Sequence, residues 1–124
     1  MLEVYRQIFS IFCERLQNIT NVLEVKVFGS RARGDATEES DLDLFIKVAT
    51  LDRSLRSKIM DLAWEIGFEN DRVISTFVVS EQQIQQGALG ASPLLFKIAN
   101  EGITIYSSFT HYEAQLNVYR NQVS

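Results

Sequence analysis

The fold of this chain is decided by the stretch Gly29-Ser30-Arg31-Ala32-Arg33-Gly34 and by Ser40-Asp41-Leu42-Asp43-Leu44, which follows a short polar segment. The first stretch ends a β-branched run with a tight turn, and the second alternates polar and apolar residues as a strand does. Side chains at positions i and i+2 of a strand share a face, so Asp41 and Asp43 are expected to point the same way. Apolar residues fill the other face, so a one-residue slip in register would bury both aspartates.

Two neighbouring carboxylates repel each other unless a cation lies between them. Hard cations such as Mg²⁺ prefer oxygen ligands, and proteins commonly hold them with one or two carboxylates plus phosphate oxygens. Gly29 allows the backbone to approach a phosphate because it has no Cβ, and Ser30 offers both a hydroxyl and an N–H. These residues predict a site for a nucleotide and a metal ion, with Asp41 and Asp43 as the metal ligands.

Two arginines lie between the turn and the aspartates. Arg31 and Arg33 have the charge and geometry to clamp phosphate groups or an acidic partner. Because loop arginines are also common as solvated surface charges, this alternative stays open for both residues.

The composition limits the classes of function that this chain can have. The 124 residues, 46% of them apolar and 23% charged, are expected to form one globular domain over residues 1–124. A net charge of −4 argues against a nucleic-acid groove but is compatible with one nucleotide. One cysteine and one histidine cannot by themselves form a Cys/His zinc site.

The sequence also suggests a location. No apolar stretch approaches the roughly 18 residues that a membrane span needs, so no membrane association is expected. The first residues lack the pattern of a signal peptide, and the single cysteine, Cys13, rules out an internal disulfide. A cytoplasmic location is therefore expected, with Cys13 packed in the core.

Hydrophobic periodicity predicts alternating helices and strands. Helices are expected over residues 3–18, 52–68 and 81–86 and from Pro93 to a left-handed cap at Gly102, with Ser80 and Ser92 as N-caps. Strands are expected over residues 23–28, 41–48, 73–79 and 103–106. Residues 30–34 form either a short helix or a loop, and a last helix is expected after residue 110. Trp64 is expected in the core. The fold class is α/β, a small sheet flanked by helices.

The spacing of Gly29-Ser30 and Asp41-Leu42-Asp43 resembles the signature of the nucleotidyltransferase superfamily that includes DNA polymerase β. The short chain and the Gly-Ser-Arg-Ala-Arg-Gly-Asp motif resemble its smallest branch, the minimal nucleotidyltransferases (MNT). The segments 94–98, 101–103 and 105–106 resemble the carboxyl end of that branch. The resemblance implies a mixed sheet like the polymerase β palm and Mg²⁺ with ATP as substrate. It further implies catalytic and metal-binding roles for Asp41 and Asp43, and nucleotide contacts from Gly29, Ser30, Arg31, Arg33 and Ser40.

The resemblance also implies a partner. Minimal nucleotidyltransferases are often paired with a HEPN ribonuclease toxin, which they counter as antitoxins by transferring AMP from ATP to a toxin tyrosine. A small-molecule nucleotidyltransferase of the antibiotic-modifying type is an alternative. A non-catalytic antitoxin that neutralises its partner by binding alone is another. A template-directed polymerase is disfavoured by the acidic charge and the size.

One departure from the family pattern concerns catalysis. Members often carry a third carboxylate on the later strand, but residues 73–79 read Val-Ile-Ser-Thr-Phe-Val-Val and contain no acid. Glu69 and Asp71 precede this strand and are the candidates for a replacement. If neither contributes, the chain either binds nucleotide without catalysing or needs an acceptor that loses its proton easily, as a tyrosine phenol with a pKa of about 10 does.

Overall fold

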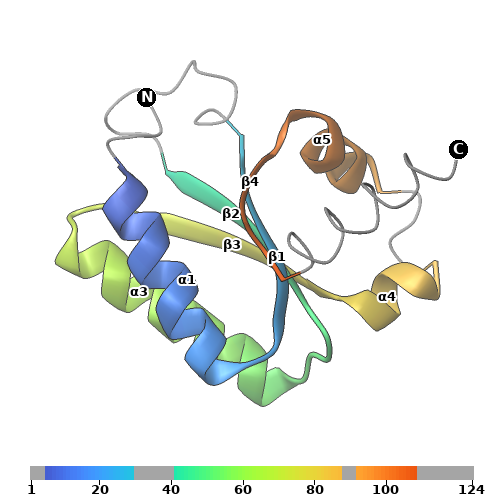
Figure 1. The fold of residues 1–124 in the computed structure, drawn as a ribbon, viewed down its shortest axis with the longest axis horizontal. Helices are drawn as coiled ribbons and strands as arrows, with labels where there is room; N and C mark the ends of the chain where they lie inside the picture. Colours follow the sequence, from blue (N-terminus) through green and yellow to red (C-terminus); the bar gives the residue numbers. More distant parts are fainter. Residues whose placement is uncertain (1–4, 30–40, 88–91, 109–124) are drawn as a thin grey trace, which may run out of the picture.

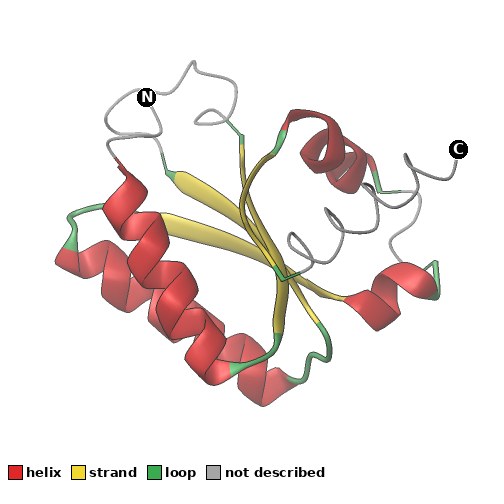
Figure 2. Ribbon diagram, viewed as in Figure 1, coloured by secondary structure: helices red, strands yellow, loops and turns green. Residues whose placement is uncertain are grey.

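The computed structural model describes residues 5–29, 41–87 and 92–108 (Figure 1). Helices and strands follow one another, as an α/β fold requires (Figure 2). In chain order they are α1 (Arg6–Ile19), β1 (Val22–Phe28), β2 (Leu42–Val48), α3 (Arg53–Glu69), β3 (Ile74–Ser80), α4 (Glu81–Gln85), α5 (Pro93–Glu101) and β4 (Ile103–Ser107). The predicted alternation is confirmed, with element ends shifted by at most three residues. The helix expected after residue 110 lies outside the described residues.

The four strands form one mixed sheet in the order β3-β2-β1-β4. Strand β1 pairs antiparallel with both β2 and β4, whereas β2 and β3 run parallel. The parallel pair needs a crossover connection, which α3 provides. The register places Phe28 of β1 and Ser75 of β3 on either side of Asp43. The predicted small mixed sheet is therefore confirmed.

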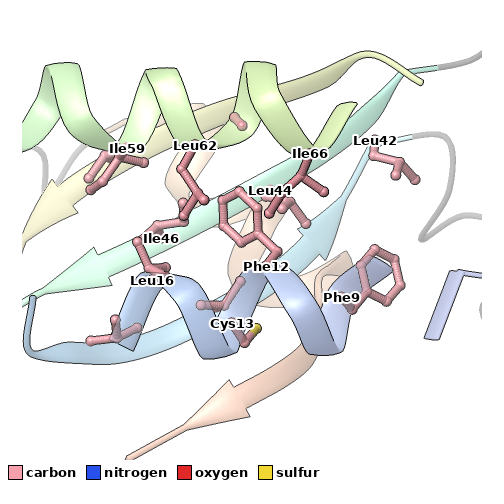
Figure 3. Packing of buried hydrophobic residues seen from close by; sticks show 14 of the residues in the cluster. Phe9, Phe12, Cys13, Leu16, Leu42, Leu44, Ile46, Ile59, Leu62 and Ile66 are labelled. Atoms are coloured by element: carbon pink, nitrogen blue, oxygen red, sulfur yellow. The ribbon is translucent and has the colours of Figure 1, made fainter. Parts of the chain in front are cut away.

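The main core lies between one face of the sheet and the helices α1 and α3 (Figure 3). Strand β2 contributes its alternate residues to this core, and the two helices contribute one apolar face each. Fully buried members of this core are Phe12, Leu16, Val25, Val27, Leu42, Leu44, Ile46, Val48, Ile59 and Ile66. Burying a side chain of this size contributes about 1.5–3 kcal/mol, so this core fixes the register of β2.

A second, smaller core covers part of the opposite face. Phe45, Val79 and Ile98 are buried there, against partly buried residues of α4 and α5. Phe45 lies on the same face as Asp43, so this face is not a plain polar surface. The second core covers the far end of the face, while the aspartates lie at the other end.

The predicted N-caps are confirmed, and the predicted C-cap at Gly102 needs correction. Ser80 forms a capping box with Gln83 at the start of α4, and Ser92 accepts a hydrogen bond from the Leu95 N–H at the start of α5. The prediction of a left-handed Gly102 is wrong, because this residue is extended (φ −68°, ψ 147°). A Cβ at this position would overlap the Ile98 carbonyl oxygen, so glycine is required here for space.

The exposed faces of the helices give a second correction. Trp64 of α3 is 71% exposed, so the prediction that it lies in the core is wrong. Cys13, by contrast, is buried as predicted. None of the described helices is long and apolar enough to cross a membrane.

Candidate functional site

The two predicted metal ligands lie at the start of β2. Asp41 immediately precedes the strand and is exposed, whereas Asp43 lies within it and is half-buried. The Ser75 hydroxyl donates a hydrogen bond to Oδ2 of Asp41 at 3.4 Å. Because Ser75 is in register with Asp43 on the neighbouring strand, the three polar side chains share one face of the sheet.

Gly29 packs directly against the Asp43 side chain from the β1 side. Its φ of +72° lies in the left-handed region, which favours glycine. A Cβ at Gly29 would overlap Oδ2 of Asp43 and lie 3.3 Å from its Cγ. Both the backbone conformation and the space therefore require glycine, and the turn after β1 begins in contact with the carboxylate.

The other predicted nucleotide-binding residues are Ser30, Arg31, Arg33 and Ser40, and they lie outside the described residues. They are the residues between Gly29 and Asp41 in the chain. The two described ends of this segment, at Gly29 and Asp41, are brought to the same edge of the site by the antiparallel pairing of β1 and β2.

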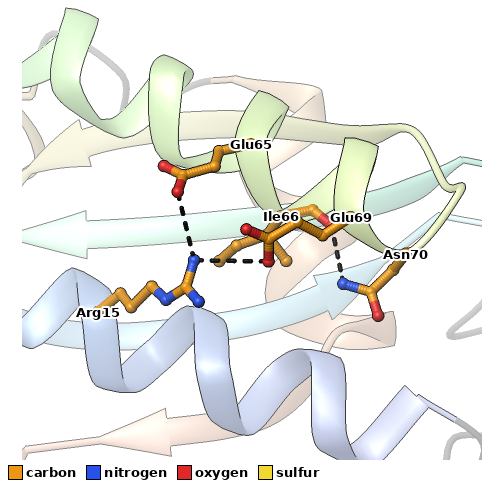
Figure 4. Close-up of polar contacts among 5 residues, drawn as sticks. All are labelled: Arg15, Glu65, Ile66, Glu69 and Asn70. Carbon is orange, nitrogen blue, oxygen red and sulfur yellow. Dashed lines mark hydrogen bonds and ion pairs between the residues drawn. The ribbon is translucent and has the colours of Figure 1, made fainter.

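The candidates for a third carboxylate do not join the pair. Glu69 lies 3.7 Å from Arg15, on the helical side of the molecule, where Arg15 also meets Glu65 (Figure 4). Asp71 lies in the turn between α3 and β3 with φ +53°. Within the described part of the chain, no histidine, cysteine or third acid combines with Asp41 and Asp43 into a metal-binding group of three.

Ser75 is the residue that inspection of the sequence missed. It occupies the position on β3 beside Asp43, where a third carboxylate on this strand would face the pair. The alternation Ser75, Phe77, Val79 was visible in the sequence, but the parallel register that sets Ser75 against Asp43 was not. The described donors are two carboxylates and one hydroxyl, so the set is all oxygen and suits a hard divalent cation such as Mg²⁺.

Aromatic side chains border the site toward the second core. The rings of Phe45 and Phe77 stack with centroids 6.1 Å apart and an interplanar angle of 24°. Phe28, opposite Asp43 in the register, packs against the same cluster. This aromatic cluster lies on the same face of the sheet as Asp43, and Asp41 and Ser75 remain exposed beside it.

The sequence of the chain matches the model of a known family. The model of the family described as "Polymerase beta, Nucleotidyltransferase" matches residues 12–110. The chain belongs to this family. The match includes the Gly29-Ser30 turn and both aspartates, so the family suggested by the motif is confirmed. No curated protein sequence matches the chain.

Solved structures share the fold of this nucleotidyltransferase. A chain of a toxin–antitoxin complex crystallised with AMP-PNP is 18% identical, with a TM-score of 0.52 over 90% of this chain and 95% of its own. A chain from a mutant MntA-HpeT toxin–antitoxin is 14% identical, with a TM-score of 0.53 over 93% and 97%. A chain from a tri-AMPylated Shewanella oneidensis HEPN toxin in complex with MNT antitoxin is 19% identical, with a TM-score of 0.50 over 94% and 88%. At these identities the likeness establishes the polymerase β-like fold.

Proposed function

We propose that this chain is a Mg²⁺-dependent nucleotidyltransferase that transfers AMP from ATP to a tyrosine hydroxyl of a HEPN-type toxin. In this role it acts in the cytoplasm as the antitoxin of that toxin. The observation that carries the proposal is the pair Asp41 and Asp43 on one face of β2, with Gly29 against Asp43. The named toxin–antitoxin complexes that share the fold support the choice of partner.

The proposed reaction assigns a role to each described residue of the site. Asp41 and Asp43 would hold the metal ion, which when bound neutralises charge on the phosphates. The acceptor oxygen forms a bond to the α-phosphorus of ATP, the bond to the β-phosphate bridge breaks, and pyrophosphate leaves. Gly29 keeps the β1 side of Asp43 free of a Cβ, so that backbone and phosphate can approach each other closely. Ser75 orients Asp41 through its hydrogen bond.

The acceptor is inferred from the residues that surround the aspartates. Among the described residues no third acid joins the pair in a metal-binding group, and the β3 position beside Asp43 is Ser75, which cannot act as a carboxylate base. An alkyl alcohol would then ionise too rarely, whereas a phenol with a pKa of about 10 releases its proton to water far more readily. This difference supports a tyrosine as the group that receives AMP.

The test is the intact mass of the co-expressed toxin after incubation with ATP and Mg²⁺. Wild-type protein is expected to add one or more AMP units, and the double variant Asp41→Asn/Asp43→Asn is expected to add none. Asp61→Asn, an exposed aspartate of α3, is the matched control and should retain full transfer. An unmodified toxin in a stable complex with wild-type protein would reject the transfer reaction and favour the antitoxin that acts by binding alone.

A further inference from the structure

A large groove runs between α3 and β3, where Asp71, Arg72, Ser75 and Thr76 line it together with apolar side chains. Its volume is about 1110 Å³. The helix side presents Met60, Trp64 and Phe68, which are 61%, 71% and 75% exposed, and the strand side begins with Val73, which is 61% exposed. Exposed apolar surface of this kind marks an interaction site in a soluble domain.

The helix side of the groove carries a stacked aromatic pair. The rings of Trp64 and Phe68 stack with centroids 5.4 Å apart and an interplanar angle of 8°. Stacked side chains have already lost much of their rotamer freedom, so a ligand that packs on them loses less entropy on binding. The large aromatic residues are also those most often found to dominate binding energy.

The groove reaches the site through one residue. Ser75 lines the groove, and its hydroxyl donates to Asp41. Gly29 approaches Asp43 from β1, whereas Ser75 lies on β3, on the other side of the aspartates. In phosphoryl transfer the attacking and leaving oxygens are roughly in line. If the Gly29 turn holds the phosphates, the leaving pyrophosphate would lie on the β1 side and the attacking hydroxyl would enter from the β3 side.

Strand β3 is also open to pairing. It lies at the end of the sheet, with β2 as its only strand neighbour in the described part of the chain. The groove is lined by the consecutive residues 73–76, which is expected for a groove along a strand edge because successive side chains point to opposite faces. An edge of this kind accepts an extended segment of another protein through main-chain hydrogen bonds.

We propose that the groove between α3 and β3 docks the acceptor protein through an extended apolar segment. This segment pairs with the edge of β3, packs apolar side chains on Trp64 and Phe68, and directs the acceptor hydroxyl past Ser75 toward Asp41. The inference rests on the proposed function, because it assigns the acceptor side of the same site. It adds the surface that selects the acceptor.

The test uses the full chain and its co-expressed toxin. The variant Trp64→Ala/Phe68→Ala removes the stacked aromatic pair of the groove. Phe96→Ala on α5, where the side chain is 70% exposed, is the matched control. Both changes affect exposed side chains, so both proteins are expected to fold, as thermal unfolding would verify. Calorimetry measures the Kd for the toxin, and a separate titration with ATP and Mg²⁺ measures nucleotide binding.

The groove variant is expected to raise the Kd for the toxin about 30-fold or more, as loss of an aromatic hot spot does. It should raise the KM for the toxin in the transfer assay and leave nucleotide binding unchanged, whereas Phe96→Ala should change none of these. If wild-type protein binds the toxin through the groove but transfers no AMP, the docking surface stands and the proposed reaction fails. If wild-type protein transfers AMP and the groove variant does so with equal Kd and KM, the docking proposal is overturned and the reaction stands.

A second measurement tests the mode of binding. Hydrogen exchange at the backbone amides of residues 73–76 is expected to slow when the toxin is bound, because strand pairing protects them. Unchanged exchange at these amides would overturn the proposal that an extended segment pairs with β3. A wild-type dimer in sedimentation that Trp64→Ala/Phe68→Ala converts to a monomer would also overturn the proposal, because the occupant would then be a second copy of the chain.

Discussion

Replacement of Gly29 by alanine tests whether this turn positions Asp43. At φ +72° an alanine is strained by about 1–2 kcal/mol. The added Cβ would also overlap Oδ2 of Asp43, which must rotate away or push the backbone aside. Forcing a side chain off its preferred rotamer costs about 0.5–1.5 kcal/mol. Gly29→Ala is therefore expected to lower the free energy of unfolding by about 1.5–3.5 kcal/mol.

Gly87 offers a control that isolates the collision. Its φ of +77° is nearly the same, but a Cβ there would meet no atom of the described residues within 4 Å. Gly87→Ala should therefore lose only the 1–2 kcal/mol of backbone strain. For a chain of this length 1 kcal/mol corresponds to about 3–5 °C in Tm, so the two variants should differ measurably in thermal unfolding. The difference between them is the free energy of the contact with Asp43.

The variants Gly29→Ala and Gly87→Ala should differ far more in AMP transfer than in stability. A catalytic group displaced by about 1 Å lowers a rate by about 100-fold. Gly29→Ala is expected to lose transfer on this scale and to weaken Mg²⁺-dependent ATP binding in a titration, and Gly87→Ala should match wild type in both assays. If Gly29→Ala binds ATP and transfers AMP as wild type does, Gly29 does not set the position of Asp43 and the reasoning is refuted.

Three further predictions follow from single side chains. Ser75→Asp places a third carboxylate beside Asp43 and should raise the affinity for Mn²⁺ in calorimetry, and an unchanged affinity would show that Ser75 does not face a metal site. Phe12→Ala removes a fully buried ring and should lower the free energy of unfolding in urea by about 3–5 kcal/mol, whereas a loss below 1 kcal/mol would contradict the packing. Burial raises the pKa of the Cys13 thiol from 9.0 to about 11, so the unfolded chain releases this proton at lower pH than the folded protein does. The stability associated with Cys13 is present below pH 9 and falls by about 2 kcal/mol between pH 9 and 11, a fall that Cys13→Ala should lack in urea unfolding at the two pH values.

The elements that the sequence predicted well are those with a strict period. Leu42, Leu44 and Ile46 alternate with Asp43 and Phe45, and this alternation alone places the aspartate on the face opposite the main core. The N-caps Ser80 and Ser92 were equally predictable from the sequence, because their side chains accept hydrogen bonds from backbone N–H groups only three residues away. The spacing of residues in the sequence was sufficient to predict contacts between residues that are close together along the chain.

The features that the sequence did not predict depend on contacts between distant residues. Trp64 lies on the outer side of α3 because Ile59, Leu62 and Ile66 already fill the inner side, and hydrophobicity alone could not distinguish the two sides. The burial of Phe45 depends on Ile98 of α5, which is far along the chain. Pairwise packing of this kind is set by the tertiary fold and not by the period of a single element.

The mixed topology explains why the site lies where it does. Because β1 is antiparallel to β2, the end of β1 and the Gly29 turn meet the start of β2 at Asp43. Because β3 is parallel to β2, the start of β3 also lies there, and the crossover through α3 brings the groove with Trp64 to the same end of the sheet. An antiparallel β3 would instead place its far end beside the aspartates and carry Ser75 away from Asp41. The single parallel pair thus allows the Gly29 turn, Ser75 and the groove to meet at one pair of carboxylates, as the proposed transfer to a docked acceptor requires.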